Sequence, residues 1–171
     1  MTALAALKAQ FNRRRPAVLV ASVWLLGLIL GWWFVRAGGI PLVLRVRSAS
    51  MKTHSFFFML IGCATLYGSV ALILQFFSRH WILCIVLMKA LFFSASGFAI
   101  SAAYQSAAWL IVSLLLFSDF WISAIFLWYC YRTLSSKSLR KNEFLVCFGV
   151  TILVISLDHF AVSPFLMMLF T

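Results

Sequence analysis

Apolar residues fill five long stretches of this chain, and short polar or basic segments separate them. A helix needs about 20 predominantly apolar residues to cross the hydrocarbon core of a bilayer. The pattern therefore predicts five transmembrane helices, over residues 17–36, 55–78, 82–103, 107–131 and 144–166. We expect them to form one all-α integral membrane bundle, because no stretch of residues 1–171 resembles a separate soluble domain.

The composition agrees with a membrane protein, since 65% of the 171 residues are hydrophobic and only three are acidic. The first predicted helix follows a basic segment, as the apolar part of a signal peptide does. It is as long as a membrane span, however, and it does not end in a small-residue cleavage site. It ends at Trp32 and Trp33, which are typical of the membrane interface. We therefore expect this helix to be retained.

Basic residues in the segments between helices predict the orientation in the membrane. The five-helix pattern places nine of them on one side: Lys8, Arg13, Arg14, Arg15, Arg79, Arg132, Lys137, Arg140 and Lys141. It places four on the other side: Arg36, Arg45, Arg47 and Lys52. Because basic residues collect on the cytoplasmic side, we expect a multi-pass cell-membrane protein with its N-terminus inside and its C-terminus outside.

Residues 38–54 contain most of the basic residues on the outer side, and we expect this segment to lie along the membrane surface. Ile40, Leu42, Val43 and Leu44 would then contact lipid, while the basic side chains would lie near lipid phosphates. The net charge of +11 is spread over both sides of the membrane. It therefore indicates membrane lipids as partners, and not nucleic acid.

The sequence contains no catalytic or cofactor-binding motif. Four cysteines fall in or at the ends of predicted helices without CxxC spacing, which indicates buried apolar residues: Cys63, Cys84, Cys130 and Cys147. His54, His80 and His159 belong to different segments and form no metal-binding pair. Motifs for a nucleophile, a phosphate or a dinucleotide are also missing, so we expect neither an enzyme nor a cofactor.

Lys89 and Asp119 are charged residues that lie well inside predicted helices, where an unpaired charge is costly. Lys89 is in the third helix, and Asp119 is near the middle of the fourth. Because these helices form an adjacent antiparallel hairpin, the two side chains can form an ion pair, with Ser123 on the same helix face as Asp119. Two alternatives remain open: Lys89 could extend to the cytoplasmic surface, or the pair could belong to a proton or ion relay.

Small residues recur on two predicted helices. The first helix contains a GxxxG motif, Gly27 to Gly31, and the third has four small residues on one face: Ala90, Ser94, Gly97 and Ser101. Such residues let another helix backbone approach closely in lipid. We interpret both patterns first as packing within the bundle, with a homo-oligomer contact or a cavity wall as alternatives.

Asp158 and His159 lie in the outer half of the fifth predicted helix, shortly before Pro164. Proline removes a backbone donor and tends to end or kink a helix. We interpret this group as a polar helix end near the outer surface. The alternative is a docking point for an extracytoplasmic partner.

Three groups of residues follow one another in an order typical of a known family. The first group is Lys89 followed by small residues and the pair Gly97-Phe98. The second, in the next predicted helix, is Leu116-Phe117-Ser118-Asp119. The third is Asp158 followed by apolar residues and Ser163-Pro164. In this order, about two thirds of the chain resembles the stage II sporulation protein M family. That family consists of compact polytopic membrane proteins with a basic N-terminus.

The resemblance implies a role in endospore formation. Family members anchor a peptidoglycan-hydrolase complex in the septal membrane during engulfment, together with stage II sporulation proteins D and P. The family member is not itself the hydrolase, so the expected function is that of a non-enzymatic scaffold. Two other hypotheses remain: a small transport or channel subunit that uses Lys89, Asp119 and Asp158, or an intramembrane enzyme that acts on lipid.

Overall fold

A computed structural model describes residues 3–43, 56–103, 116–135, 141–162 and 164. These residues form five long helices: α1 (Ala3–Phe34), α3 (Phe56–Phe76), α4 (Ile82–Ala103), α6 (Phe117–Ser135) and α7 (Lys141–Leu157). Three short helical segments complete the described part: η1 (Val35–Gly39), η2 (Arg79–Trp81) and η3 (Asp158–Val162). The all-α prediction is confirmed.

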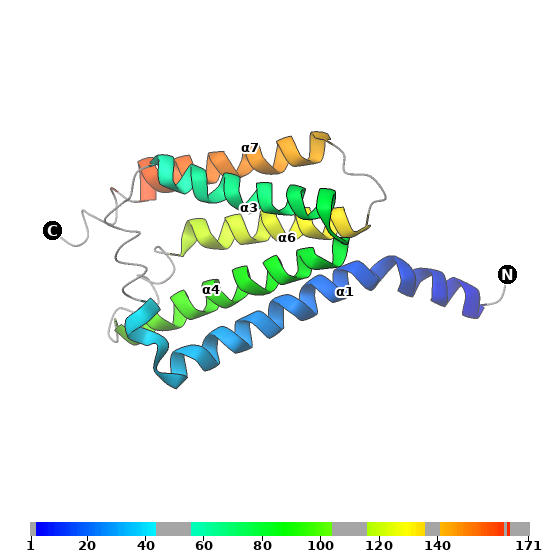
Figure 1. Cartoon of the computed structure of the whole chain (residues 1–171), viewed down its shortest axis with the longest axis horizontal. Helices are drawn as coiled ribbons and strands as arrows, with labels where there is room; N and C mark the ends of the chain where they lie inside the picture. The colour runs from blue at the N-terminus through cyan, green and yellow to red at the C-terminus, as the bar shows by residue number, and fades with distance from the viewer. Residues whose placement is uncertain (1–2, 44–55, 104–115, 136–140, 163, 165–171) are drawn as a thin grey trace.

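Successive long helices run in opposite directions along a common axis, and α6 lies in the middle of the bundle (Figure 1). The pair α3 and α7 covers one side of α6, and the pair α4 and α1 lies on the other. The first turns of α1 extend beyond the ends of the other helices. In consequence, α1 begins at one end of the bundle and η3 ends at the other.

Four helical stretches of the described residues are long and apolar enough to cross a membrane: Arg15–Val43, Met59–Phe76, Arg79–Ala102 and Asn142–Val162. They match the first, second, third and fifth predicted spans. The described part of the predicted fourth span lies in α6, which is less apolar because it contains Asp119 and Arg132 and because serine, threonine and tyrosine lie on its inward face. The structure therefore shows a multi-pass pattern of four candidate spans around a fifth, more polar helix.

The helix boundaries differ from the predicted ones at the start of α1 and at the end of α6. Helix α1 begins at Ala3 instead of residue 17, since residues 3–15 consist largely of good helix formers such as Ala, Leu, Gln and Arg. It also continues through Pro16, which the apolar pattern had placed just outside the span. Of the predicted fourth span, residues 107–115 lie outside the described part, and α6 continues to Ser135.

The chain turns sharply after α1. Gly38, inside η1, adopts a φ of 99°, which residues with a side chain rarely adopt, and this allows the backbone to bend within that segment. Ile40 and Val43 then pack against the buried cluster of Val35, Ala95 and Ala99. The segment predicted to contact lipid along the surface thus begins with two residues that contact α4. Residues 44–54 lie outside the described part.

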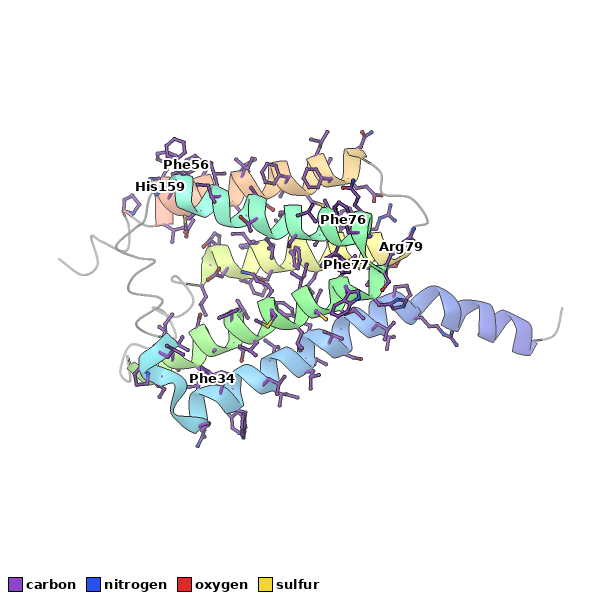
Figure 2. All side chains as sticks on the ribbon, in the orientation of Figure 1. Phe34, Phe56, Phe76, Phe77, Arg79 and His159 are labelled. Carbon is purple, nitrogen blue, oxygen red and sulfur yellow. The ribbon has the colours of Figure 1, made fainter. Side chains whose placement is uncertain are left out.

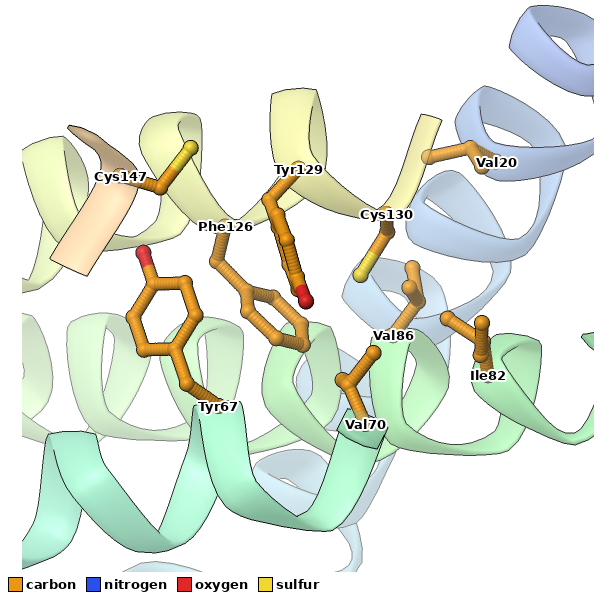
Figure 3. Close-up of a cluster of buried hydrophobic side chains, with 9 residues drawn as sticks. All are labelled: Val20, Tyr67, Val70, Ile82, Val86, Phe126, Tyr129, Cys130 and Cys147. Atoms are coloured by element: carbon orange, nitrogen blue, oxygen red, sulfur yellow. The ribbon is translucent and has the colours of Figure 1, made fainter. Parts of the chain in front are cut away.

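All five long helices contribute to one large core cluster, drawn in Figure 3. Its buried members are Val20, Tyr67, Val70, Ile82, Val86, Phe126, Tyr129, Cys130 and Cys147. Tyr67 of α3 lies at its centre, since its ring is within 6.2 Å of the rings of Phe126, Tyr129, Phe144 and Phe148. We call this group the Tyr67 cluster.

Candidate functional site: an ion pair and two helix seams

Lys89 of α4 and Asp119 of α6 lie together inside the bundle. The lysine Nζ is 3.6 Å from the Asp119 Oδ1, and the two side chains are 20% and 27% exposed. The residues on either side of Lys89 in α4 are apolar, so the Asp119 carboxylate provides a countercharge that lipid cannot. The structure thus brings the two residues together across neighbouring antiparallel helices.

Ser123 lies one turn after Asp119 on the same face of α6, and it is buried. Its hydroxyl donates a hydrogen bond of 2.5 Å to the backbone carbonyl of Asp119. This type of bond to the preceding turn satisfies a serine hydroxyl within its own helix. Ser123 therefore supports the local backbone at Asp119, and this hydrogen bond does not involve the carboxylate.

The GxxxG motif of α1 packs directly against the small residues of α4. A Cβ atom added at Gly27 would lie 2.5 Å from the Cβ of Ala90, and one added at Gly31 would lie 2.5 Å from the carbonyl oxygen of Leu91. These distances are too short for any side chain at either glycine. The two small-residue patterns are therefore the two sides of one helix contact, which we call the α1–α4 seam.

A hydrogen bond crosses the α1–α4 seam. The hydroxyl of Ser94 donates to the backbone carbonyl of Leu28 over 2.7 Å. Such a bond requires the two backbones to lie close together, and small residues permit this approach. Gly97 and Ser101 continue the same face of α4 but line an apolar groove beside the seam. Of the four small residues predicted on this face of α4, Ala90 and Ser94 therefore pack against α1, and Gly97 and Ser101 form part of a groove wall.

The residues predicted as a docking point lie at the far end of the bundle. Asp158 and His159 belong to η3, and His159 packs beside Phe56, the first residue of α3 (Figure 2). The centroids of the His159 and Phe56 rings are 5.8 Å apart. Pro164 is exposed. This end of the chain is therefore held against α3 by aromatic contacts while Pro164 faces outward.

The residue patterns did not predict a buried hydrogen bond between α3 and α7. The hydroxyl oxygens of Tyr67 and Thr151 are 2.8 Å apart, and both residues are fully buried. Thr151 donates its own hydrogen to the carbonyl of Cys147, so Tyr67 is the donor in the bond between them. The two residues are 84 positions apart, and nothing in either helix pattern identifies the partner.

A second ion pair, also not predicted, joins the other end of α6 to α7. Arg132 Nη2 is 2.5 Å from Glu143 Oε1 of α7, and the guanidinium lies 5.7 Å from the centre of the Trp128 ring. Both charged residues flank the short polar segment between the fourth and fifth predicted spans. Their closeness to that connection is the signal in the sequence that could have identified the pair.

The cysteines and histidines give no sign of a metal centre within the described ranges, where no three potential ligands gather. All four cysteines are free, and Cys63, Cys130 and Cys147 are buried as the sequence predicts. Cys84 is exposed on α4 instead. Comparison of the chain with models of known protein families finds no match. Comparisons with curated proteins and with solved structures find none either.

Proposed function

We propose that all five long helices cross the membrane, α6 included, and that the protein is a non-enzymatic membrane scaffold. The observation that carries the first part is the sidedness of α6. Its exposed face is apolar and aromatic: Phe117, Phe120, Trp121, Ala124 and Trp128. Its buried face contains Ser118, Ser123, Tyr129 and Thr133. A helix with polar residues inward and large apolar residues outward is suited to lipid, despite its lower overall apolarity.

The orientation proposed from the charges agrees with the helix directions. Arg79 and Arg132 lie at the end of the bundle where α1 emerges, and Arg36 lies at the other end. With basic residues on the cytoplasmic side, the N-terminus is inside the cell and η3 is near the outer surface.

The scaffold function is supported by the way polar side chains inside the bundle are used. Lys89 pairs with Asp119, Tyr67 bonds to Thr151, and the Ser94 hydroxyl bonds to the α1 backbone. Groups that pair with each other stabilise helix packing and do not form an obvious path for a substrate. Large aromatic side chains fill the space between α3, α6 and α7.

A narrower form of the proposal concerns the partners. The order of motifs between Leu87 and Pro164 resembles the stage II sporulation protein M family, and this resemblance supports a cell-wall hydrolase or its membrane anchor as the partner. The outer end of the bundle, around His159 and Phe160, would be the docking surface. Residues 38–54, which the charge pattern places on the same side, would be a second docking segment. Because Ile40 and Val43 pack against the buried cluster of Val35, Ala95 and Ala99, a deletion of residues 40–50 would disturb the fold as well as any docking there.

A photo-crosslinking amino acid at one of two matched positions tests this proposal. Phe160 at the outer end is 71% exposed, and Phe76 at the inner end is 70% exposed. We expect a crosslink to an identified cell-wall hydrolase or its anchor from position 160 and none from position 76. Equal crosslinking from both positions, or none from either, would contradict the scaffold proposal.

One observation favours transport as a second candidate: the Lys89–Asp119 pair is only partly buried. The purified protein in liposomes distinguishes the two functions. We expect no movement of protons or solutes. Movement that is lost in the Lys89→Met variant would support transport and contradict the scaffold.

A further inference from the structure

An apolar groove of about 480 Å³ lies beside the α1–α4 seam. Leu28 and Trp32 of α1 form one wall, Phe93, Gly97 and Ser101 of α4 are on the other, and Leu116 just before α6 also lines it. The groove exists because Gly97 has no side chain and Ser101 has a small one, while large side chains stand on either side of them. Ile29 and Phe98 also line the groove and are exposed, so it opens on the outside of the bundle.

The groove has a deep end and an end near the membrane surface. Because α1 and α4 run in the same direction, Trp32 and Ser101 lie at one end of the groove and Leu28 and Phe93 at the other. Tryptophan prefers the interface between lipid and water, which places the Trp32 end near the headgroups. From Ser101 to Phe93 the helix rises about 12 Å.

The length of the groove indicates which kind of molecule it can hold. One leaflet contributes about 15 Å to the hydrocarbon core, so the groove extends through most of one leaflet and not into the second. A transmembrane helix of a second copy would run through the whole core of about 30 Å, more than twice the length of the groove. A single acyl chain, which occupies one leaflet only, has the matching length.

A basic group lies at the headgroup end. The guanidinium of Arg36 is 5.4 Å from the centre of the Trp32 ring, and Trp32 lines the groove. Guanidinium groups bind phosphate through paired hydrogen bonds, and they are often held flat on an aromatic ring. Apolar walls ending at a cation match a lipid with an acyl tail and a phosphate.

We propose that this groove binds one anionic phospholipid of the bilayer, with an acyl chain between α1 and α4 and the phosphate at Arg36. The proposal requires only that α1 and α4 cross the membrane, and both are long and apolar enough to do so. It does not depend on α6 or on the scaffold function. A bound lipid would complete the outer half of the α1–α4 seam, where the small residues of α4 leave the groove open.

Native mass spectrometry of the full-length protein with palmitoyl-oleoyl phosphatidylglycerol tests the proposal. We expect one lipid that is retained after the others have been removed. Gly97→Leu places a side chain in the groove, with its Cβ 3.2 Å from the Cδ1 of Leu116, and should weaken retention about tenfold or more, because several methylene contacts with the lipid are lost. Arg36→Gln should weaken it about threefold to tenfold, and Arg36→Lys less. Gly62→Leu is the matched control, since a Cβ at Gly62 meets no atom within 4 Å.

Three outcomes would overturn the proposal. The first is equal retention of phosphatidylglycerol by the Gly97→Leu and Gly62→Leu variants. The second is equal retention of phosphatidylglycerol and phosphatidylcholine, unaffected by Arg36→Gln. The third is a dimer that Gly97→Leu converts to a monomer, which would identify a second copy as the occupant. If Gly97→Leu fails to fold, Ser101→Leu fills the same groove and provides the same comparison.

Discussion

The α1–α4 seam and the Tyr67 cluster hold helices together in different ways. At the seam, Gly27 and Gly31 bring two backbones into contact, and the Ser94 hydroxyl bonds to a backbone carbonyl. In the cluster, large rings from α3, α6 and α7 interlock around Tyr67, which bonds to Thr151. Lipid supplies little hydrophobic drive between helices, so each contact depends on close packing and interhelical hydrogen bonds. The α1–α4 seam packs closely because its glycines have no side chains, whereas the Tyr67 cluster packs closely because large side chains fill the space between its helices.

The difference predicts opposite responses to a change in side-chain size. The seam has no room for an added atom, whereas the cluster has many contacts to lose. Substitutions that enlarge residues should therefore damage the seam, and substitutions that shorten them should damage the cluster.

The largest effect is expected for Tyr67→Ala. Removing a fully buried ring leaves a cavity among four other rings, and such changes cost about 3–5 kcal/mol of unfolding free energy. Reversible unfolding in mixed micelles measures this cost. Tyr131→Ala on α6 is the matched control, because Tyr131 is only partly buried and should lose much less. Equal losses of unfolding free energy at the two positions would contradict a central place for Tyr67 in the core.

The next largest effect is expected for Gly31→Leu. Even the first added carbon would lie 2.5 Å from the carbonyl oxygen of Leu91, so α1 and α4 must separate, at a cost of about 2–3 kcal/mol or more. Gly62→Leu on α3 adds the same atoms facing open space and should change stability little. The same unfolding measurement applies, and a similar stability for the two variants would mean that α1 and α4 are not in direct contact.

These two glycine positions show how far the sequence predicts the fold. The small-residue stripes on α1 and α4 were visible in the sequence, and α3 also contains two glycines, Gly62 and Gly68. Only the three-dimensional arrangement shows that Gly27 and Gly31 face α4 while Gly62 and Gly68 face open space. A stripe of small residues in the sequence shows which face of a helix can pack closely, but it does not show which helix packs against that face.

The candidate site was predictable for a related reason. Lys89 and Asp119 lie on consecutive predicted helices at similar depths, so the hairpin geometry limits the choice of partner. Tyr67 and Thr151 have no such constraint, since two other helices separate them in the chain. The polarity of α6 also becomes understandable only in three dimensions, where its serine, threonine and tyrosine residues face the other helices.

An intermediate effect is expected when the ion pair is broken. Lys89→Met leaves the Asp119 carboxylate without this cation inside the bundle, and we expect a loss of about 1–2 kcal/mol. Asp119→Asn should cost a similar amount. The double variant should lose about 0.5–1.5 kcal/mol less than the sum, because no unpaired charge remains. Strictly additive losses in thermal unfolding would show that the two residues do not interact.

The smallest losses of stability are expected when single hydrogen bonds are removed, and they should differ between the Tyr67 cluster and the α1–α4 seam. Thr151→Val leaves the buried Tyr67 hydroxyl without its acceptor and should cost about 1–2 kcal/mol. Ser94→Ala should cost only about 0.5 kcal/mol, because the helical Leu28 carbonyl keeps its backbone partner. Thr65→Val is the control, since the Thr65 hydroxyl bonds within its own exposed helix turn. A larger loss for Ser94→Ala than for Thr151→Val would reverse the comparison.

The central claim is that the polar helix α6 crosses the membrane among four apolar ones, and the number of spans tests it most directly. Single cysteines at Thr2 and at Thr171 can be labelled with a membrane-impermeant maleimide in intact cells, in a background with Cys84→Ala to remove the exposed native thiol. Five spans predict that position 171 is labelled from outside and that position 2 is labelled only after the cells are opened. Labelling of both positions from the same side would contradict the account, because it requires an even number of spans.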